Sequence, residues 1–320
     1  MKDNPIIAIT GISSFIGANL AVKYASEGFN VIGLVSESIS TYSNIRKKRL
    51  DLCEEKGVKL HQFDLKDENS IKYFFKQYKV DYFIHHAAWV KDANSLHFDL
   101  DSALSVNVLP LRIIFEELSK SSAKGIIVTG TNAEYGDKKN GCKESDICLP
   151  TTPYGLSKLC MTLTSFQLFN EFKLPTRIAR VFNPLGALDN PKKLLPSIIH
   201  QISKNKTFDL SNCLQKRDFI YIGDLINGYY KLSEDLDRKD FDIFNLCSGE
   251  AISVKDLLES IAKKMGKDNS LLNFGALPMR PGEPLIAYGN NQKAIDVLGW
   301  KASSIKDQID VITKEILNEY

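Results

Sequence analysis

The stretch IIAITGISSFIG at residues 6–17 decides the fold. Its first five residues form a continuous apolar run, which is typical of a strand buried on both faces of a sheet. Gly11 and Gly17 enclose the turn that follows, and a helical pattern runs from residue 18 to residue 27. A strand, a glycine turn and a helix in this order form the context in which a dinucleotide pyrophosphate binds the N-terminus of a helix. A plain strand–helix turn is the alternative interpretation.

The same alternation continues along the first 180 residues. Further strands are predicted at the following apolar runs: residues 30–35, 60–63, 81–85, 125–129 and 176–181. Helices are predicted at the following segments: residues 68–77, a long helix from about 101 to 120, 154–172, 254–264 and 305–317. This order predicts an α/β fold with a Rossmann-like, doubly wound parallel sheet. We place this dinucleotide-binding domain at residues 1–180, with a later strand near 241–248 returning to it, and a smaller α/β substrate lobe at 181–320.

Composition and charge argue against several classes of function. The 320 residues are 43% hydrophobic and 25% charged, and the net charge of +2 gives no field that would attract nucleic acid or an anionic membrane. No apolar run reaches 18 residues, and the first residues do not form a signal peptide. The six cysteines lack a C-x-x-C pair and the histidines lack zinc-ligand spacing. We therefore expect thiols in a reducing cytoplasm and no metal site.

Tyr154 and Lys158 lie four residues apart, on one face of the predicted helix. An ammonium beside a phenol favours the phenolate, so we expect a lowered pKa for Tyr154 and proton transfer at a sugar or alcohol oxygen, with a nicotinamide coenzyme carrying the hydride. The spacing alone is weak evidence, because an ordinary surface pair gives the same pattern. Thr131 follows the strand 125–129, at the edge where catalytic groups of such sheets gather, and is expected to bind a substrate oxygen beside Tyr154.

The end of the second predicted strand bears on the coenzyme. An acid there would hold the ribose 2′-hydroxyl of NAD, but Val35 and Ser36 occupy this place. Without that carboxylate a 2′-phosphate is acceptable, and Ser36 or Arg46 is expected to bind it. The sequence therefore favours NADP and leaves NAD possible. Asp64 is expected to accept from the adenine amino group, or alternatively to cap the next helix.

Together these residues resemble the extended short-chain dehydrogenase/reductase family of NAD(P)-dependent nucleotide-sugar epimerases, dehydratases and reductases. The resemblance covers nearly the whole chain and is carried by the following segments: residues 10–17, 64–65, 85–88, 107, 131–136, 153–158, 180–183, 217–221 and 280–283. It implies that Thr131, Tyr154 and Lys158 are catalytic. With the residues argued above, the expected coenzyme site comprises Gly11, Ser13, Ser14, Phe15, Ile16, Gly17, Ser36, Arg46, Asp64, Leu65, Ala87, Ala88, Asn107, Tyr154 and Lys158. The expected site for a nucleoside-diphosphate sugar comprises Thr131, Asn132, Asn183, Leu195, Arg217, Arg280 and Glu283.

The segment TNAEY at residues 131–135 bears on the subfamily. Dehydratases of the family carry an acidic residue two positions before the tyrosine that corresponds to Tyr135, and some carry a second acidic residue directly before the first. Here these positions are occupied by Ala133 and Asn132. Glu134 lies one residue off and is expected to face the other way in an extended segment. A glutamate directly before the tyrosine resembles the reductases of 4-keto-6-deoxy sugar nucleotides.

The leading hypothesis is therefore an NADP-dependent reductase of the 4-keto group of a nucleoside-diphosphate (6-deoxy)sugar, in surface-polysaccharide sugar biosynthesis. An NAD-dependent nucleotide-sugar 4-epimerase is the alternative. A 4,6-dehydratase and a non-catalytic NADP-sensing protein are ranked below both. The resemblance implies a homodimer formed by two helices of each subunit in a four-helix bundle. We expect the protein to be cytoplasmic and to have no nucleic-acid, membrane or metal partners.

Overall fold

The computed structural model describes residues 4–93, 95–121, 123–138, 140–279 and 284–319. The chain divides into two compact units, which are described in turn. The first unit comprises residues 1–136, 144–181 and 226–244, and the second comprises residues 137–143, 182–225 and 245–320. A segment from the C-terminal half of the chain thus belongs to the first unit.

The first unit is built on a seven-stranded sheet with the strand order β11-β6-β5-β4-β1-β2-β3. Its strands are β1 (Ile6–Thr10), β2 (Asn30–Val35), β3 (Lys59–Gln62), β4 (Tyr82–His85), β5 (Gly125–Thr131), β6 (Thr176–Val181) and β11 (Phe241–Leu246). The neighbouring strands from β3 to β6 pair in parallel. The order reverses between β1 and β4, which is the switch point of a doubly wound sheet. The predicted Rossmann-like α/β fold is confirmed.

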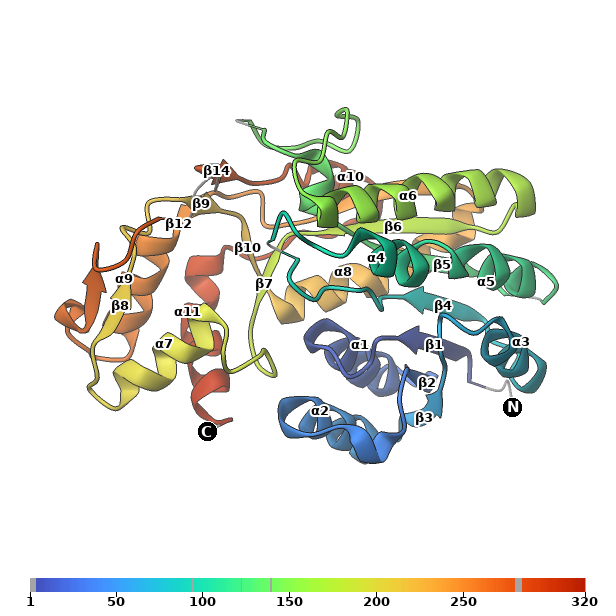
Figure 1. Ribbon diagram of the computed structural model, residues 1–320, viewed down its shortest axis with the longest axis horizontal. Helices are drawn as coiled ribbons and strands as arrows, with labels where there is room; N and C mark the ends of the chain where they lie inside the picture. Colours follow the sequence, from blue (N-terminus) through green and yellow to red (C-terminus); the bar gives the residue numbers. More distant parts are fainter. Residues whose placement is uncertain (1–3, 94, 122, 139, 280–283, 320) are drawn as a thin grey trace. The chain divides into compact units, whose positions relative to one another are not determined.

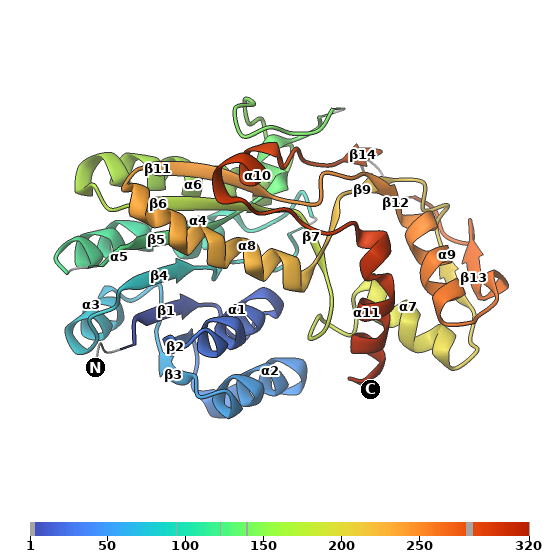
Figure 2. The same ribbon diagram turned by 180° about the vertical axis from the view of Figure 1, so that it is seen from behind.

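Helices cover both faces of this sheet (Figures 1 and 2). One face carries α3 (Glu68–Gln77), α4 (Leu100–Asn107), α5 (Pro110–Ser119) and α6 (Pro153–Phe172). The other carries α1 (Phe15–Ser26), α2 (Asn44–Glu55) and α8 (Ile222–Asp235). Every residue of β5 is buried, as the continuous apolar run predicts for a central parallel strand.

The long helix predicted for residues 101–120 is wrong. The structure has two helices there, α4 and α5, which are separated by Val108 and Leu109. Pro110 causes the break, because it has no amide hydrogen to donate and its ring clashes with the preceding turn. Pro110 instead occupies the first position of α5, where an amide hydrogen would have no partner within the helix.

The second unit combines short strands with four helices in its described part. Its strand pairs are β7 (Asn183–Leu185) with β10 (Phe219–Tyr221), β8 (Phe208–Leu210) with β13 (Leu272–Phe274), and β9 (Lys216–Arg217) with both β12 (Ile252–Ser253) and β14 (Ile286–Ala287). Its helices are α7 (Leu194–Ser203), α9 (Val254–Lys264), α10 (Gln292–Leu298) and α11 (Ile305–Leu317). Apolar side chains of α7, α9 and α11 form its core, among them Ile199, Leu258 and Ile312.

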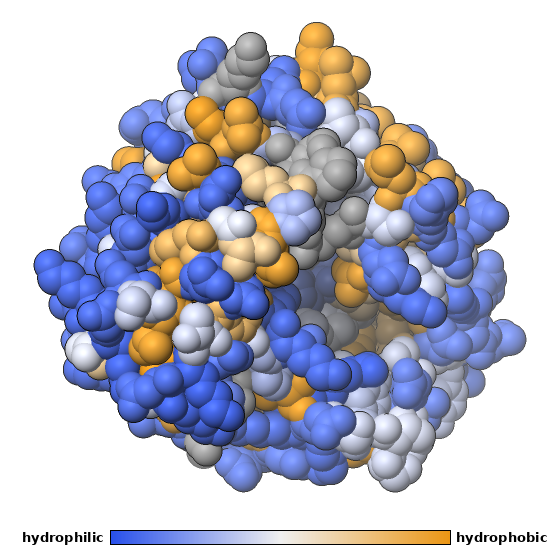
Figure 3. Space-filling model, turned by 60° about the vertical axis from the view of Figure 1, so that its left-hand side comes forward, coloured by the Kyte–Doolittle hydropathy of each residue, from blue (hydrophilic) through white to orange (hydrophobic). Residues whose placement is uncertain are grey.

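Among the described residues, no helix is both long enough and apolar enough to cross a membrane. The face of the molecule in Figure 3 is mainly hydrophilic, with hydrophobic side chains scattered over it. Such scattered apolar side chains are normal on a protein surface.

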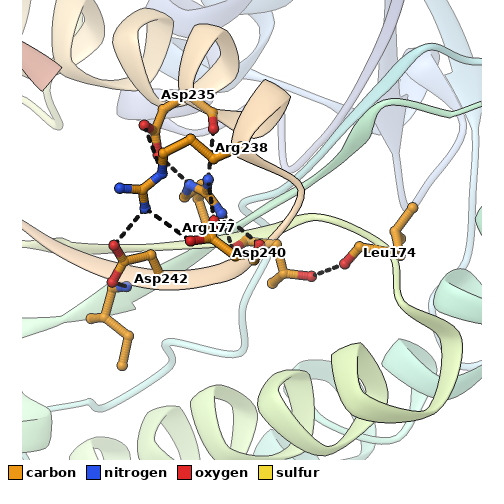
Figure 4. A network of polar contacts seen from close by, with 8 residues as sticks. Leu174, Arg177, Asp235, Arg238, Asp240 and Asp242 are labelled. Atoms are coloured by element: carbon orange, nitrogen blue, oxygen red, sulfur yellow. Dashed lines mark hydrogen bonds and ion pairs between the residues drawn. The ribbon is translucent and has the colours of Figure 1, made fainter. Parts of the chain in front are cut away.

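A buried ion pair fixes the outer edge of the first unit (Figure 4). The Arg177 side chain on β6 is 0% exposed, and its Nε donates to the carboxylate of Asp235, which is 8% exposed. The same guanidinium donates to the backbone carbonyl of Asp240 at 2.6 Å. Arg238 adds a second cation beside Asp235, at 3.2 Å. The strand β6 is thereby joined to the segment that leads into its neighbour, the edge strand β11.

Replacing the carboxylate of this pair tests its importance. Asp235→Asn is expected to lower the free energy of unfolding by about 3 kcal/mol, because it leaves the buried Arg177 charge with only the half-exposed carboxylate of Asp240, at 2.7 Å. Urea denaturation followed by circular dichroism measures the loss. Glu171→Gln, which breaks the exposed pair between Arg112 and Glu171, is the control and should change stability little. Equal stability of the two variants would contradict the account of the pair.

Candidate active site

The turn after β1 leads directly into the N-terminus of α1 and leaves no room for a side chain at its two glycines. Gly11 has a φ of +72°, and a Cβ there would lie 2.9 Å from the Cα of Ala87. A Cβ at Gly17 would lie 2.3 Å from the carbonyl oxygen of Gly11. Ser14 caps α1, because its Oγ accepts the amide hydrogen of Gly17 at 3.0 Å. The turn thus presents a helix N-terminus at the carboxyl edge of the sheet, which suits a pyrophosphate.

A chain of hydrogen bonds runs from this turn into the unit. His86 Nε2 lies 3.0 Å from Ser14 Oγ, and His86 Nδ1 lies 3.1 Å from Thr129 Oγ1. Thr129 Oγ1 in turn lies 2.8 Å from the hydroxyl of Tyr229 on α8. Burial lowers the pKa of His86 to about 3, so the ring is neutral at physiological pH. Sequence reasoning missed Thr129 and Tyr229, because no local pattern connects residues of different elements that lie 100 positions apart.

The segment after β4 is fixed at two points. Thr10 Oγ1 accepts the amide hydrogen of Ala87 at 2.9 Å. Asn107 is fully buried; its Oδ1 accepts the amide hydrogen of Trp89 at 2.8 Å, and its Nδ2 donates to Ser157 Oγ at 3.3 Å. The predicted coenzyme residue Asn107 therefore also joins this segment to α6.

Thr131, Tyr154 and Lys158 come together at the carboxyl edge of the sheet. Thr131 is the last residue of β5, Tyr154 is the second residue of α6, and Lys158 follows one turn later. The hydroxyl of Thr131 acts on the phenol of Tyr154 as a hydrogen-bonding group and lowers its pKa. Thr131 Oγ1 also donates to the side-chain oxygen of Asn132 at 3.3 Å. The structure therefore places a hydroxyl beside the phenol, as a site that handles an alcohol oxygen requires.

The pKa of Tyr154 differs from the prediction. Burial raises the pKa of Tyr154 to about 12, although the hydrogen bond with Thr131 opposes the shift. Burial lowers the pKa of Lys158 to about 8. Lys158 is 2% exposed, and its Nζ lies 3.8 Å from the sulfur of Met161. The predicted lowering of the Tyr154 pKa is therefore wrong, because burial removes the phenolate from water and the negative charge of Glu134 adds to this shift.

The backbone conformation at Glu134 also differs from the prediction. Residues 132–135 form a short 3-10 helix, not an extended segment. The carboxylate of Glu134 is fully buried and accepts hydrogen bonds from Thr131 N at 2.8 Å, Thr162 Oγ1 at 2.9 Å and Arg180 Nε at 2.9 Å. Because its oxygens are engaged in this way, Glu134 does not serve as the carboxylate base that a dehydratase needs.

A guanidinium and three hydroxyl groups gather near the end of β2. We name Ser13, Ser36, Tyr42 and Arg46 the Arg46 cluster. Arg46 Nη2 lies 3.3 Å from Ser13 Oγ, and the guanidinium carbon lies 4.3 Å from the centre of the Tyr42 ring. Ser36 Oγ lies 3.4 Å from the Tyr42 hydroxyl. A guanidinium surrounded by hydroxyl groups suits a phosphate.

Asp64 and Leu65 follow β3. Asp64 Oδ1 accepts the amide hydrogen of Lys66 at 2.9 Å. The cap of α3 is Asp67, whose side chain accepts the amide hydrogen of Asn69, so the capping alternative for Asp64 is wrong. Its coenzyme role stays a prediction. The other predicted coenzyme residues lie in the segments already described: Phe15 and Ile16 open α1, and Ala88 follows β4.

The predicted substrate residues of the second unit lie on separate elements. Asn183 begins β7, and its Nδ2 donates to the carbonyl of Asp218 at 2.8 Å. Leu195 is buried on α7, in the core of the unit. Arg217 ends β9 and is half-buried. Two further predicted residues lie outside the described part of the chain: Arg280 and Glu283.

Comparison with known proteins gives matches to one enzyme family. Residues 7–247 match the model of the NAD dependent epimerase/dehydratase family. The UDP-glucose 4-epimerase of Halalkalibacterium halodurans is 26% identical, over 92% of this chain and 90% of its own. UDP-glucose 4-epimerase 2 of Arabidopsis thaliana is 24% identical, over 98% of this chain and 94% of its own.

A solved structure shares the fold. UDP-glucuronic acid 4-epimerase from Bacillus cereus, in complex with UDP-glucuronic acid and NAD, matches with a TM-score of 0.84 and 23% identity. The match covers 98% of this chain and 100% of that one. At this identity the likeness shows the fold alone.

The buried lysine generates a prediction for stability. Lys158→Met is expected to stabilise the protein below pH 8, because the wild type holds a charged group away from water there. The difference between the ordinary pKa of 10.5 and about 8 corresponds to about 3 kcal/mol. From pH 8 to 10.5 the wild type becomes more stable, since only its unfolded state still binds the proton, and the advantage of the variant shrinks.

Urea denaturation at pH 7, 9 and 10.5 checks this prediction. Lys56→Met is the matched control, since Lys56 is exposed, and it should show no such dependence on pH. A Lys158→Met variant that is less stable than the wild type at pH 7 would contradict it.

Proposed function

Because the chain belongs to the NAD dependent epimerase/dehydratase family, we propose that it inverts C4 of a nucleoside-diphosphate sugar by oxidation and re-reduction. One observation carries the proposal: a phenol, a hydroxyl and a buried ammonium meet at the carboxyl edge of the sheet, in Tyr154, Thr131 and Lys158. The two relatives named above are UDP-glucose 4-epimerases, which favours the epimerase alternative of the sequence over the reductase that it ranks first.

The residues present fit a nicotinamide dinucleotide. Gly11 and Gly17 keep side chains out of the turn, and the N-terminus of α1 would hold the pyrophosphate. Lys158 would hold the nicotinamide ribose. When bound, the coenzyme supplies the acceptor and donor of the hydride at C4. The neighbouring solved epimerase structure contains NAD.

Tyr154 moves the proton in this scheme. It takes the proton of the 4-hydroxyl as the hydride leaves C4, and it returns this proton when the hydride returns to the other face of C4. Thr131 donates a hydrogen bond to the same oxygen and orients it. Because burial raises the pKa of Tyr154 to about 12, the phenolate needs a cation beside it. Lys158, one turn further along α6, would supply that cation at pH values below its pKa of about 8.

Turnover of UDP-sugars tests the proposal. The purified protein is expected to convert UDP-glucose into its C4 epimer without net absorbance change in the nicotinamide band. Tyr154→Phe should lower kcat by about 10²–10⁴-fold and leave the Kd for the UDP-sugar nearly unchanged, since only proton transfer is lost. Tyr73→Phe, on an exposed side chain of α3, is the control.

Two outcomes of these experiments would contradict the proposal. Unimpaired turnover in Tyr154→Phe, or no epimer from the GDP, CDP, UDP or dTDP forms of the sugar, would refute the proposal.

A second candidate function, the NADP-dependent 4-ketoreductase, is favoured by the Arg46 cluster. The cluster presents a guanidinium where a carboxylate would hold the ribose of NAD. An added 2′-phosphate on the coenzyme would find donors from Arg46, Ser13 and Ser36 there. Stoichiometric loss of NADPH with a 4-keto sugar nucleotide would identify this reductase.

Coenzyme affinity measures the role of the cluster. Arg46→Ala is expected to weaken NADP binding by about tenfold and NAD binding much less, because a charged hydrogen bond to the 2′-phosphate is lost. Lys48→Ala is the control, since it removes an equal charge from another face of α2. Isothermal titration of the wild type and the two variants gives the six Kd values. Equal losses for NAD and NADP would remove the support for NADP.

We also propose a homodimer formed through α6. Three of its apolar side chains are exposed: Leu156 at 41%, Leu163 at 58% and Phe166 at 49%. Their spacing of seven and three residues places them on one face of the helix, which suits packing against a second copy. The cytoplasmic location and the link to surface polysaccharides stay predictions of the sequence.

A further inference from the structure

Glu134 has no part in the reaction proposed above, yet it is 0% exposed beside the residues that carry it. A charged side chain is rarely buried completely unless it is paired. We propose that Glu134 is a positioning residue: its carboxylate fixes the turn that carries Thr131 and supplies the negative charge that faces Lys158 and Tyr154. This inference rests on the proposed function of these three residues.

The first support is the contact with Thr131. Glu134 Oε1 accepts the amide hydrogen of Thr131 at 2.8 Å. In return, Thr131 caps the 3-10 helix that contains Glu134, so each side chain bonds the backbone of the other residue in a capping box. This reciprocal arrangement fixes the backbone of Thr131, and with it the direction of its hydroxyl.

The second support is the anchoring of the other carboxylate oxygen. Glu134 Oε2 accepts from Thr162 Oγ1 at 2.9 Å, and Thr162 lies one turn beyond Lys158 on α6. It also accepts from Arg180 Nε of β6 at 2.9 Å. These partners only donate to it, as an ionised carboxylate requires. One side chain therefore ties the end of β5 to the helix that carries Tyr154 and Lys158.

The third support lies in the residue before Thr131. A Cβ at Gly130 would lie 2.5 Å from Glu134 Oε1, and 3.1 Å from the Cγ2 of Ile178. A side chain at position 130 would therefore displace the carboxylate. The sequence of β5 thus leaves the space that Glu134 fills.

The fourth support is electrostatic. The negative charge of Glu134 raises the pKa of Lys158, and burial lowers it to about 8 overall. The other titratable groups that face Lys158 are His85 and His86, and burial lowers the pKa of each to about 3, so both are neutral.

Tyr154 is faced by the same carboxylate. The charge of Glu134 adds to burial in raising the pKa of Tyr154, and Tyr229 of α8 is the second titratable group that interacts with this phenol. Without Glu134, Lys158 would lose its proton at a lower pH, and less of it would be charged at neutrality.

Lysine NMR measures this effect without substrate. In protein labelled with ¹³C at the lysine Cε, one signal is expected to titrate near pH 8 and to be absent from Lys158→Met. In Glu134→Gln its midpoint should fall by about one pH unit, because the facing negative charge is gone. Asp235→Asn is the matched control, since it breaks another buried ion pair of the same unit and should leave the midpoint unchanged.

Glu134→Asp separates charge from position. It keeps the carboxylate but shortens the side chain, so the Lys158 midpoint should stay near that of the wild type while kcat falls about tenfold or more. This variant also serves if Glu134→Gln does not fold. An unchanged midpoint in Glu134→Gln, or an unchanged kcat in Glu134→Asp, would overturn the proposal. The NMR result does not depend on turnover, so failure of the proposed function would appear separately, in Tyr154→Phe.

Discussion

The burial of the Lys158 ammonium opposite the Glu134 carboxylate is the constraint on which the candidate site depends. A lysine that is 2% exposed loses most of its hydration, and this lowers its pKa to about 8. The negative charge of Glu134 keeps the pKa of Lys158 from falling further. The same burial raises the pKa of Tyr154 to about 12, so both groups carry their protons near pH 7 in the free protein, and the phenol must release its proton before it can accept one from the sugar. The fold thus keeps the buried Lys158 ammonium at the place where the proposed reaction at a sugar oxygen needs a positive charge.

The sheet explains why these groups meet. Parallel strands bring their carboxyl ends to one edge, so the turn after β1, the segment after β4 and Thr131 at the end of β5 lie together there. Hydrogen bonds then join these segments across the sheet, through Ser14, His86, Thr129 and Tyr229. Residues that are far apart in the sequence thus contribute to one chain of hydrogen bonds, since Tyr229 on α8 contacts Thr129 on β5.

Local structure could be predicted from the sequence, whereas the burial and long-range contacts of individual side chains could not. The helices 68–77, 254–264 and 305–317 have the bounds that apolar periodicity predicts, because periodicity and caps are local properties. The break before α5 was missed although Pro110 marks it. The spacing of Tyr154 and Lys158 placed them on one face of α6, but it carried no information on burial, which decides their pKa values. The role of Glu134 depends on Arg180, which lies 46 residues away on another strand. The choice between epimerase and reductase favoured by the relatives was likewise not visible in the motif.

The fate of the hydrogen at C4 tests the central claim most directly. UDP-glucose that carries deuterium at C4 is incubated with the protein and its coenzyme, and the product is examined by NMR and mass spectrometry. The account predicts that the epimer keeps the deuterium at C4, since the hydride leaves and returns within one turnover while Tyr154 holds only the hydroxyl proton. An epimer in which solvent hydrogen has replaced the deuterium would contradict it, because inversion would then proceed by proton removal from carbon.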